Sequence, residues 1–222
     1  MGELFSIIIF GAAFIFFFFG VFLSIRNYEF TYKSKYSLLN SFPFEVNYGG
    51  NFFDNLFGNV ALVLSFIFLI VFYATFDGSH SNGMAIFALI SGILLSVFSA
   101  FIFFVPFKNL KTHIALSTFS FAFSFTLAAS IFLLNMFYYE QNDNILNLVA
   151  AIIEGIVGLV ILASVLNPKL SLRIEGREET LPNGEVKITR PKLIPYALTE
   201  WIIVFTLFID AIGIILYLIS VR

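Results

Sequence analysis

Cysteine is absent from this sequence of 222 residues, histidine occurs twice, and charged residues make up 12% of the chain. Without cysteine there can be no disulfide, no thiolate metal site and no haem attached through a thioether. Two histidines are too few for a histidine-based metal cage. A formal net charge of −2 leaves no basic surplus to neutralise a phosphate backbone. We therefore expect no metal, no cofactor and no nucleic-acid partner.

Apolar residues dominate what is present. They form 59% of the chain, and its mean hydropathy is +0.96, whereas soluble domains are about 45–50% apolar. Six apolar runs reach the length of about 20 residues that a helix needs to cross a hydrocarbon core of about 30 Å. The sequence predicts an all-α integral membrane protein with six transmembrane helices in a single polytopic domain, residues 1–222. The predicted spans are 3–25, 57–77, 84–106, 112–138, 145–166 and 197–220.

The basic residues are distributed unevenly between the connections. Of the 12 lysines and arginines, only Arg222 falls outside the connections that follow the first, third and fifth spans. The positive-inside rule then predicts an N-out/C-out topology with those three connections in the cytoplasm. The start of the chain has no positively charged segment or cleavage site of a signal peptide, so we expect its first span to be a mature helix. The absence of an Asn-x-Ser/Thr sequon weakly favours a prokaryotic plasma membrane.

The first predicted cytoplasmic segment, 26–56, is polar but rich in aromatic rings, which are typical of a headgroup boundary. Pro43 and the pair Gly49-Gly50 disfavour a continuous helix. We interpret the segment as a loop that lies on the inner leaflet or is partly tucked into it. A solvated linker with aromatic anchors is the plainer alternative, and a re-entrant segment is the less favoured one.

The second cytoplasmic segment, 167–196, carries a different pattern. Residues 170–175 and 185–190 alternate between apolar and polar, and Pro182-Asn183-Gly184 between them has the composition of a turn. The pattern predicts a small cytoplasmic β-hairpin. Because an isolated hairpin is marginally stable in water, it should pack on the membrane domain, on the loop 26–56 or on another protein.

Two carboxylates, Glu154 and Asp210, lie deep within the fifth and sixth predicted spans, and no lysine or arginine lies in any span. Glu154 is nine residues from Ile145 and Asp210 is nine from Ile219, at the outer ends of their spans. Nine residues correspond to about 14 Å, which places both side chains near the middle of the hydrocarbon core. Buried ionisable groups are costly there and often mark ion or proton pathways.

Polar and small residues at helical spacing accompany these carboxylates. On the span 197–220 they place Asp210 on an inward stripe, and on the span 145–166 a face of small residues surrounds Glu154. We therefore expect a polar seam among the spans 112–138, 145–166 and 197–220. The supporting residues of this seam are Thr206, Tyr217, Ser117, Ser120, Ser124 and Asn135.

Two carboxylates at one depth with no basic partner cannot comfortably both be ionised. Such a pair can share a proton or exchange it for a cation, so the sequence points to a proton- or cation-coupled transporter or conduit that uses Glu154 and Asp210. The structural alternative is that protonated carboxyls only link helices, contributing about 0.6–2 kcal/mol of association. Outside the pair, we interpret His113 as an interfacial residue and Glu200 as an acid that favours the positive end of its helix.

Catalysis finds little support. The sequence contains no phosphate-binding loop, His-Glu-x-x-His motif or Gly-x-Ser-x-Gly motif, and we expect no enzyme. A second class is open: a non-catalytic membrane subunit, or an assembly or regulatory protein, that binds a partner through its cytoplasmic loops. Besides the lipid bilayer, the expected partners are a second copy of the chain or another membrane protein.

Overall fold

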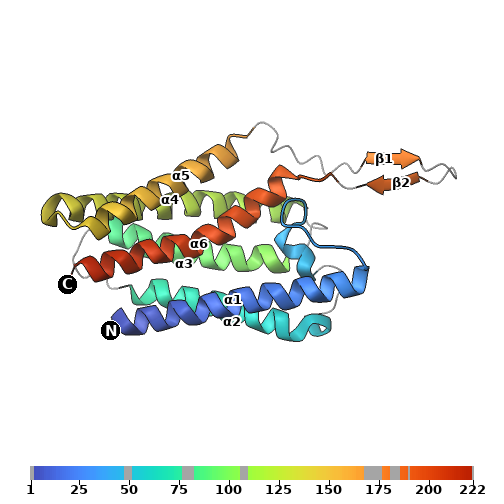
Figure 1. Ribbon diagram of the computed structural model, residues 1–222, viewed down its shortest axis with the longest axis horizontal. Coiled ribbons are helices and arrows are strands. Elements are labelled where there is room, and N and C mark those ends of the chain that lie inside the picture. The colour runs from blue at the N-terminus through green and yellow to red at the C-terminus, as the bar shows by residue number, and fades with distance from the viewer. Residues whose placement is uncertain are drawn as a thin grey trace.

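The computed structural model describes residues 3–47, 52–76, 83–105, 110–167, 177–180, 186–189 and 191–221. Six long α-helices dominate it and lie roughly along one axis (Figure 1). All six are long and apolar enough to cross a membrane, which indicates an integral, multi-pass membrane protein. The helices are α1 (Glu3–Tyr32), α2 (Leu56–Thr75), α3 (Gly83–Phe104), α4 (Leu110–Asn142), α5 (Ile145–Val165) and α6 (Pro195–Ser220).

Each predicted span coincides with one helix, but α1 and α4 continue past the predicted limits. α1 has 30 residues and α4 has 33, lengths of about 45 and 50 Å against a hydrocarbon core of about 30 Å. The prediction that a loop begins at residue 26 was therefore wrong for 26–32. Hydropathy marks where an apolar run ends, whereas a helix continues until its backbone meets a breaker, and 26–32 contains no proline or glycine.

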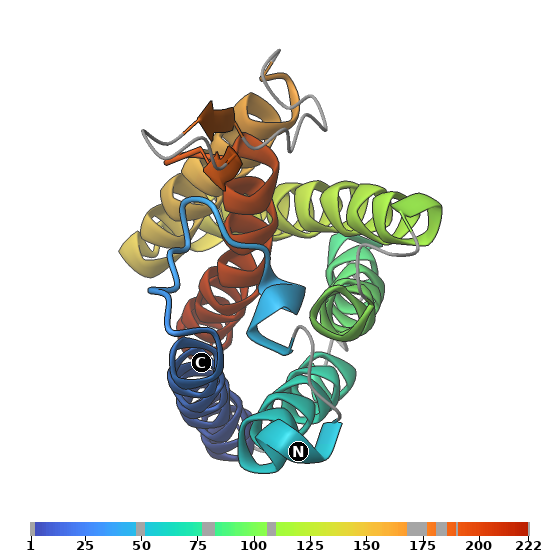
Figure 2. The ribbon, with the colours of Figure 1, turned by 90° about the vertical axis from the view of Figure 1, so that its right-hand side faces the viewer.

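α6 is the central helix of the bundle. It packs against α1, α3, α4 and α5, and in Figure 2 it lies inside the curve that the other helices describe. Its buried residues, which include Glu200, Trp201 and Asp210, fall on several faces. Polar groups on the buried faces of a membrane helix must be accommodated inside the protein, so the polar chemistry of this chain concentrates along α6.

The connection after α1 is packed into the protein at one end of the bundle. It contains two short 3₁₀ helices, η1 (Pro43–Asn47) and η2 (Phe52–Asn55), and η1 lies between α1, α3 and α6 (Figure 2). Phe42 and Phe44 are 1% and 4% exposed, and the Trp201 indole N–H donates a hydrogen bond of 2.8 Å to the Ser41 carbonyl. The loop is thus tucked into the protein at residues 41–46, whereas residues 33–35, 38, 39, 53 and 54 are exposed.

Two short strands lie in the connection between α5 and α6. β1 (Arg177–Thr180) and β2 (Val186–Thr189) pair antiparallel, with Arg177 opposite Thr189. They extend beyond the end of the helix bundle (Figure 1). β2 falls within the predicted strand 185–190, β1 follows the predicted strand 170–175, and both 170–175 and the predicted turn 182–184 lie outside the described residues.

Candidate functional site

The position of Glu154 follows from the two faces of α5. Its buried residues recur at helical spacing, from Asn147 through Ala150, Ala151 and Glu154 to Val157 and Ile161. The opposite face carries exposed aliphatic side chains, among them Ile152, Ile156 and Leu159. Because hydrocarbon solvates the aliphatic face and not a carboxylate, α5 turns Glu154 toward the protein, where it is 1% exposed.

Glu154 meets α6 at Gly213, one helical turn from Asp210. A Cβ atom built on Gly213 would overlap with Glu154 Oε1, so the carboxyl group occupies the space that a side chain at 213 would need. The two carboxyl groups interact with each other across the α5–α6 interface. The structure therefore brings together the two carboxylates that the sequence places at one depth.

Acceptor atoms accumulate around this pair without matching donors. Neither Glu154 oxygen and neither Asp210 oxygen has a hydrogen-bond partner within the described part of the chain. Asn135 of α4 donates from Nδ2 to the Ile131 carbonyl, while its Oδ1 is also unpartnered there. The Ile131 side chain lies within 3.0 Å of the position of a Cβ at Gly213, so Asn135 lies about one helical turn from the pair. Five buried acceptors of this kind call for protons or a cation.

Tyr73 of α2 is a further neighbour that sequence reasoning missed. It is fully buried, interacts with both Asp210 and Glu154, and donates from its hydroxyl to the Leu207 carbonyl of α6 at 2.9 Å. Its ring packs so closely on α3 that a Cβ at Gly92 would overlap with it. A lone tyrosine in an apolar run carries no pattern. Gly92, however, lies on an edge of small residues on α3, with Ala88, Ser96 and Ala100, and such an edge makes this close approach feasible.

The seam residues of α4 and α6 divide between several contacts. Ser124 and Thr206 share a hydrogen bond of 2.8 Å between the two helices, whereas the Ser120 hydroxyl donates to the Leu116 carbonyl of its own helix. Tyr217 is buried with its ring 4.9 Å from that of Tyr138. All the predicted supporting residues are buried, so α4 and α6 do form a polar seam. It extends beyond the carboxylate pair at both ends.

Ser117 belongs to a second buried cluster, at the start of α4 and α6. Its hydroxyl donates to Glu200 Oε1 at 2.6 Å, and His113 Nε2 lies 2.7 Å from the same oxygen. Both His113 and Glu200 have 0% exposed side chains. The interpretation of His113 as an interfacial residue is therefore wrong: the loop residues Phe42 and Phe44 cover it, with the Phe44 ring 5.2 Å from the imidazole.

The sequence held a signal for this cluster. His113 and Glu200 lie within four residues of the starts of the predicted spans 112–138 and 197–220. If these starts share one side of the membrane, two groups that can form an ion pair lie at one depth. The sequence has no comparable signal for the loop that covers His113 and so makes an interfacial position an internal one.

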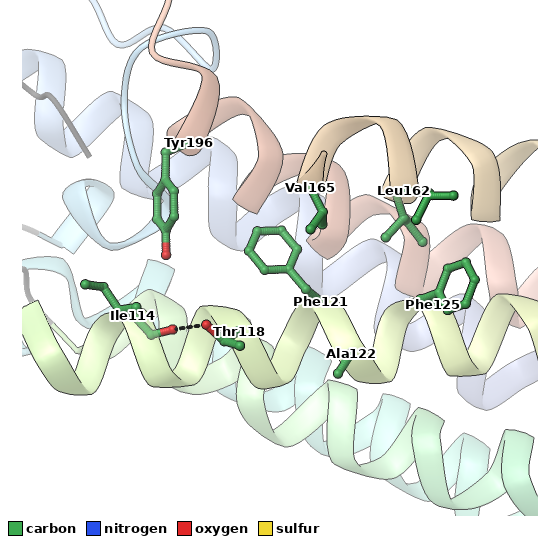
Figure 3. A pocket seen from close by; sticks show the side chains of 9 residues that line it. Ile114, Thr118, Phe121, Ala122, Phe125, Leu162, Val165 and Tyr196 are labelled. Carbon is green, nitrogen blue, oxygen red and sulfur yellow. Dashed lines mark hydrogen bonds between the residues drawn. The ribbon is translucent and has the colours of Figure 1, made fainter. Parts of the chain in front are cut away.

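A separate cavity of about 430 Å³ opens between the first half of α4 and the last turns of α5. Its walls are apolar apart from Tyr196 and Thr118 (Figure 3), and the Thr118 hydroxyl is bonded to the Ile114 carbonyl. A wall of this kind suits hydrocarbon rather than an ion. The cavity therefore does not belong to the carboxylate site.

The fold and the site together define a class: a multi-pass α-helical membrane protein with a buried carboxylate pair on adjacent helices. Comparison with models of protein families, with curated proteins and with solved structures finds no match for this chain.

Proposed function

We propose that this protein is a proton- or cation-coupled transporter or conduit in which Glu154 and Asp210 form the ion-binding site. The observation that carries the proposal is the buried pair itself. Two carboxyl groups interact across one interface, and no residue outside the pair donates a hydrogen bond to any of their four oxygens within the described part of the chain. Purely structural carboxyls would be expected to find donors across the interface.

Charge balance supports the same function. The described residues contain no group of three or more metal-binding side chains, which argues for a weakly held monovalent ion or a proton rather than a structural metal. No lysine or arginine lies in the predicted spans to neutralise the pair. Because two adjacent carboxylates repel, one bound proton or one bound cation is the simplest way to stabilise them. The proton and the cation can replace each other at this site.

The orientation of the chain is part of the proposal. With eleven of its 12 basic residues in connections on one side, the chain has both termini outside, and η1, β1 and β2 in the cytoplasm. The membrane would be a prokaryotic plasma membrane. Glu154 and Asp210 then lie about midway across, the depth at which secondary transporters commonly bind their ions.

Labelling with dicyclohexylcarbodiimide tests the site directly, because this reagent modifies protonated carboxyls in apolar surroundings. The purified protein is labelled across a range of pH, with and without Na⁺ or K⁺, and the modified peptides are mapped by mass spectrometry. We expect modification at Glu154 or Asp210 that falls when pH rises or when a transported cation is added. Glu154→Gln and Asp210→Asn should each remove label from the substituted position.

Glu140→Gln is the matched control, because Glu140 is an exposed carboxyl on α4. This variant should leave the labelling of Glu154 and Asp210 unchanged. An absence of label on both residues at every pH would show that they are sealed within helix packing, and it would contradict the proposal.

A non-catalytic subunit that binds a partner is the second candidate function. The observation in its favour is that β1 and β2 extend beyond the helix bundle (Figure 1), although a two-stranded sheet is marginal without further packing. A second copy of the chain or another membrane protein could supply that packing. Removal of the segment 170–190 would then abolish co-purification with the partner while leaving carboxyl labelling unchanged.

A further inference from the structure

We infer that His113 and Glu200 form a second proton-binding station, which passes protons between the cytoplasmic end of the bundle and the pair Glu154–Asp210. This inference rests on the proposed function and adds the route by which protons reach its site. The observations that carry it are the geometry of the His113–Glu200 contact and the hydroxyl groups that separate it from Asp210.

The hydrogen bonds of His113 fix where a proton can reside. Nδ1 lies 3.1 Å from the Val105 carbonyl, and a carbonyl only accepts, so Nδ1 carries a proton. Nε2 lies 2.7 Å from Glu200 Oε1, and this contact requires one further proton, held by the imidazole or by the carboxyl. The resting pair is therefore neutral overall and contains one shared proton.

Glu200 Oε2 is the acceptor for the proton that is passed on. It is buried and has no hydrogen-bond partner within the described ranges, whereas Oε1 already accepts from Ser117 and contacts His113. One proton enters on Oε2 and one proton leaves toward the seam, so the pair returns to its resting state with no change in electrons. The loaded pair is a buried positive charge, which makes it a transient state.

Hydroxyl groups continue from this station toward Asp210. Ser117 donates a hydrogen bond to Glu200. Further along α4 and α6 toward Asp210, the hydroxyls of Ser124 and Thr206 share a hydrogen bond of 2.8 Å. Thr206 precedes Asp210 by four residues, a rise of about 6 Å, and follows Glu200 by six, a rise of about 9 Å. Steps of this length need a side-chain rotation or an intervening water. The buried Ser120 lies between Ser117 and Ser124 on α4.

The groups around His113 make it selective for protons. Glu200 contacts it from α6, where Tyr196 interacts with Glu200, and Phe42 and Phe44 cover it from the loop. The nearest basic group on its own helix, Lys111, is exposed. On η1, Glu45 accepts a hydrogen bond from the Phe42 N–H, which ties that carboxylate to the loop backbone. Two rings over a small buried pair leave little room for a hydrated cation.

Proton flux into liposomes tests the station. The protein is reconstituted with an internal pH-sensitive dye, the membrane potential is clamped with K⁺ and valinomycin, and a pH step is applied. We expect His113→Gln and Glu200→Gln to slow the flux at least tenfold, and Glu154→Gln or Asp210→Asn to abolish it. Thr118→Val is the matched control: Thr118 is exposed, and its hydroxyl donates to the Ile114 carbonyl of its own helix, so the flux of this variant should stay within twofold of the wild type.

A spectroscopic measurement separates a relay from a structural role. In a His80→Gln chain His113 is the sole histidine, so its ¹⁵N resonances can be followed in nanodiscs across the range in which imidazole titrates, about pH 5 to 8. We expect reversible pH-dependent shifts, and a changed response in a chain that also carries Glu200→Gln. A pH-independent spectrum overturns the inference even if the flux variants misfold.

The outcomes distinguish the two proposals. Wild-type flux in the His113 and Glu200 variants, together with loss of flux in the Glu154 variant, overturns the station and leaves the carboxylate site standing. A wild-type protein that moves no protons overturns the station. The proposed function falls with it only if the protein moves no Na⁺ or K⁺ either.

Discussion

The carboxyl group of Glu154 lies in the space that a side chain at Gly213 would require. A Cβ at 213 would overlap with Glu154 Oε1 and approach the Ile131 side chain to 3.0 Å. Three helices thus meet at one glycine, one turn from Asp210. The absence of a side chain at 213 is what allows a carboxylate of α5 to reach α6.

Gly213→Ala should therefore disturb the site by sterics alone. We expect it to lower the free energy of unfolding by about 1–3 kcal/mol, as overpacking does, and to change the labelling of Glu154. Gly158→Ala is the control on α5, because nothing lies within 4 Å of a Cβ there. Thermal unfolding in detergent compares the two variants. Equal melting temperatures would contradict the close contact at Gly213.

The hydrogen bond between Ser124 and Thr206 should couple α4 to α6. In a double-mutant cycle of Ser124→Ala and Thr206→Val, we expect a coupling energy of about 0.6 kcal/mol, the average for polar contacts between membrane helices. The cycle is read from unfolding in mixed micelles. Ser130→Ala serves as the control, because its hydroxyl bonds to the Thr126 carbonyl of the same helix. The control cycle combines Ser130→Ala with Thr206→Val. If both cycles gave the same coupling energy, the contact between Ser124 and Thr206 would be refuted.

Two phenylalanines near the end of the bundle that holds η1 should differ sharply. Phe44 is 4% exposed and Phe30 is 86% exposed. Phe44→Ala should destabilise the protein by about 3–5 kcal/mol, and Phe30→Ala should have almost no effect. Trp201 is the only tryptophan and bonds the loop at Ser41, so its emission reports loop docking. A red shift is expected for Phe44→Ala alone, and identical spectra would show that the loop does not pack as described.

The orientation can be tested with single thiols, because the chain has no cysteine of its own. We expect Asn142→Cys to react with an impermeant maleimide added outside intact cells, and Thr180→Cys to react only after the cells are opened. These positions are the last residue of α4 and the last residue of β1. The reverse pattern would show that the basic connections face outward and that the charge argument fails.

Whether the environment of a residue could be predicted depends on how far away its partner lies in the sequence. The direction in which Glu154 points follows from the residues of its own helix, because small and apolar residues at helical spacing mark which face of α5 is buried. His113 contacts Glu200, 87 residues away, and nothing in the local pattern of α4 reports that partner. The loop shows the same limit, because Trp201 binds Ser41 across 160 residues.

By itself the sequence determined that this chain forms six helices long and apolar enough to cross a membrane, because a run in about 30 Å of hydrocarbon must satisfy its own backbone and a helix of that length does so. It also determined which face of α5 and α6 is polar, since helical periodicity is local. Only the tertiary structure decided which polar groups meet: that Glu154 reaches Gly213, that the Tyr73 hydroxyl of α2 bonds the Leu207 carbonyl of α6, and that a loop buries His113. Those contacts depend on how helices pack, and packing is a property of surfaces brought together from distant parts of the chain.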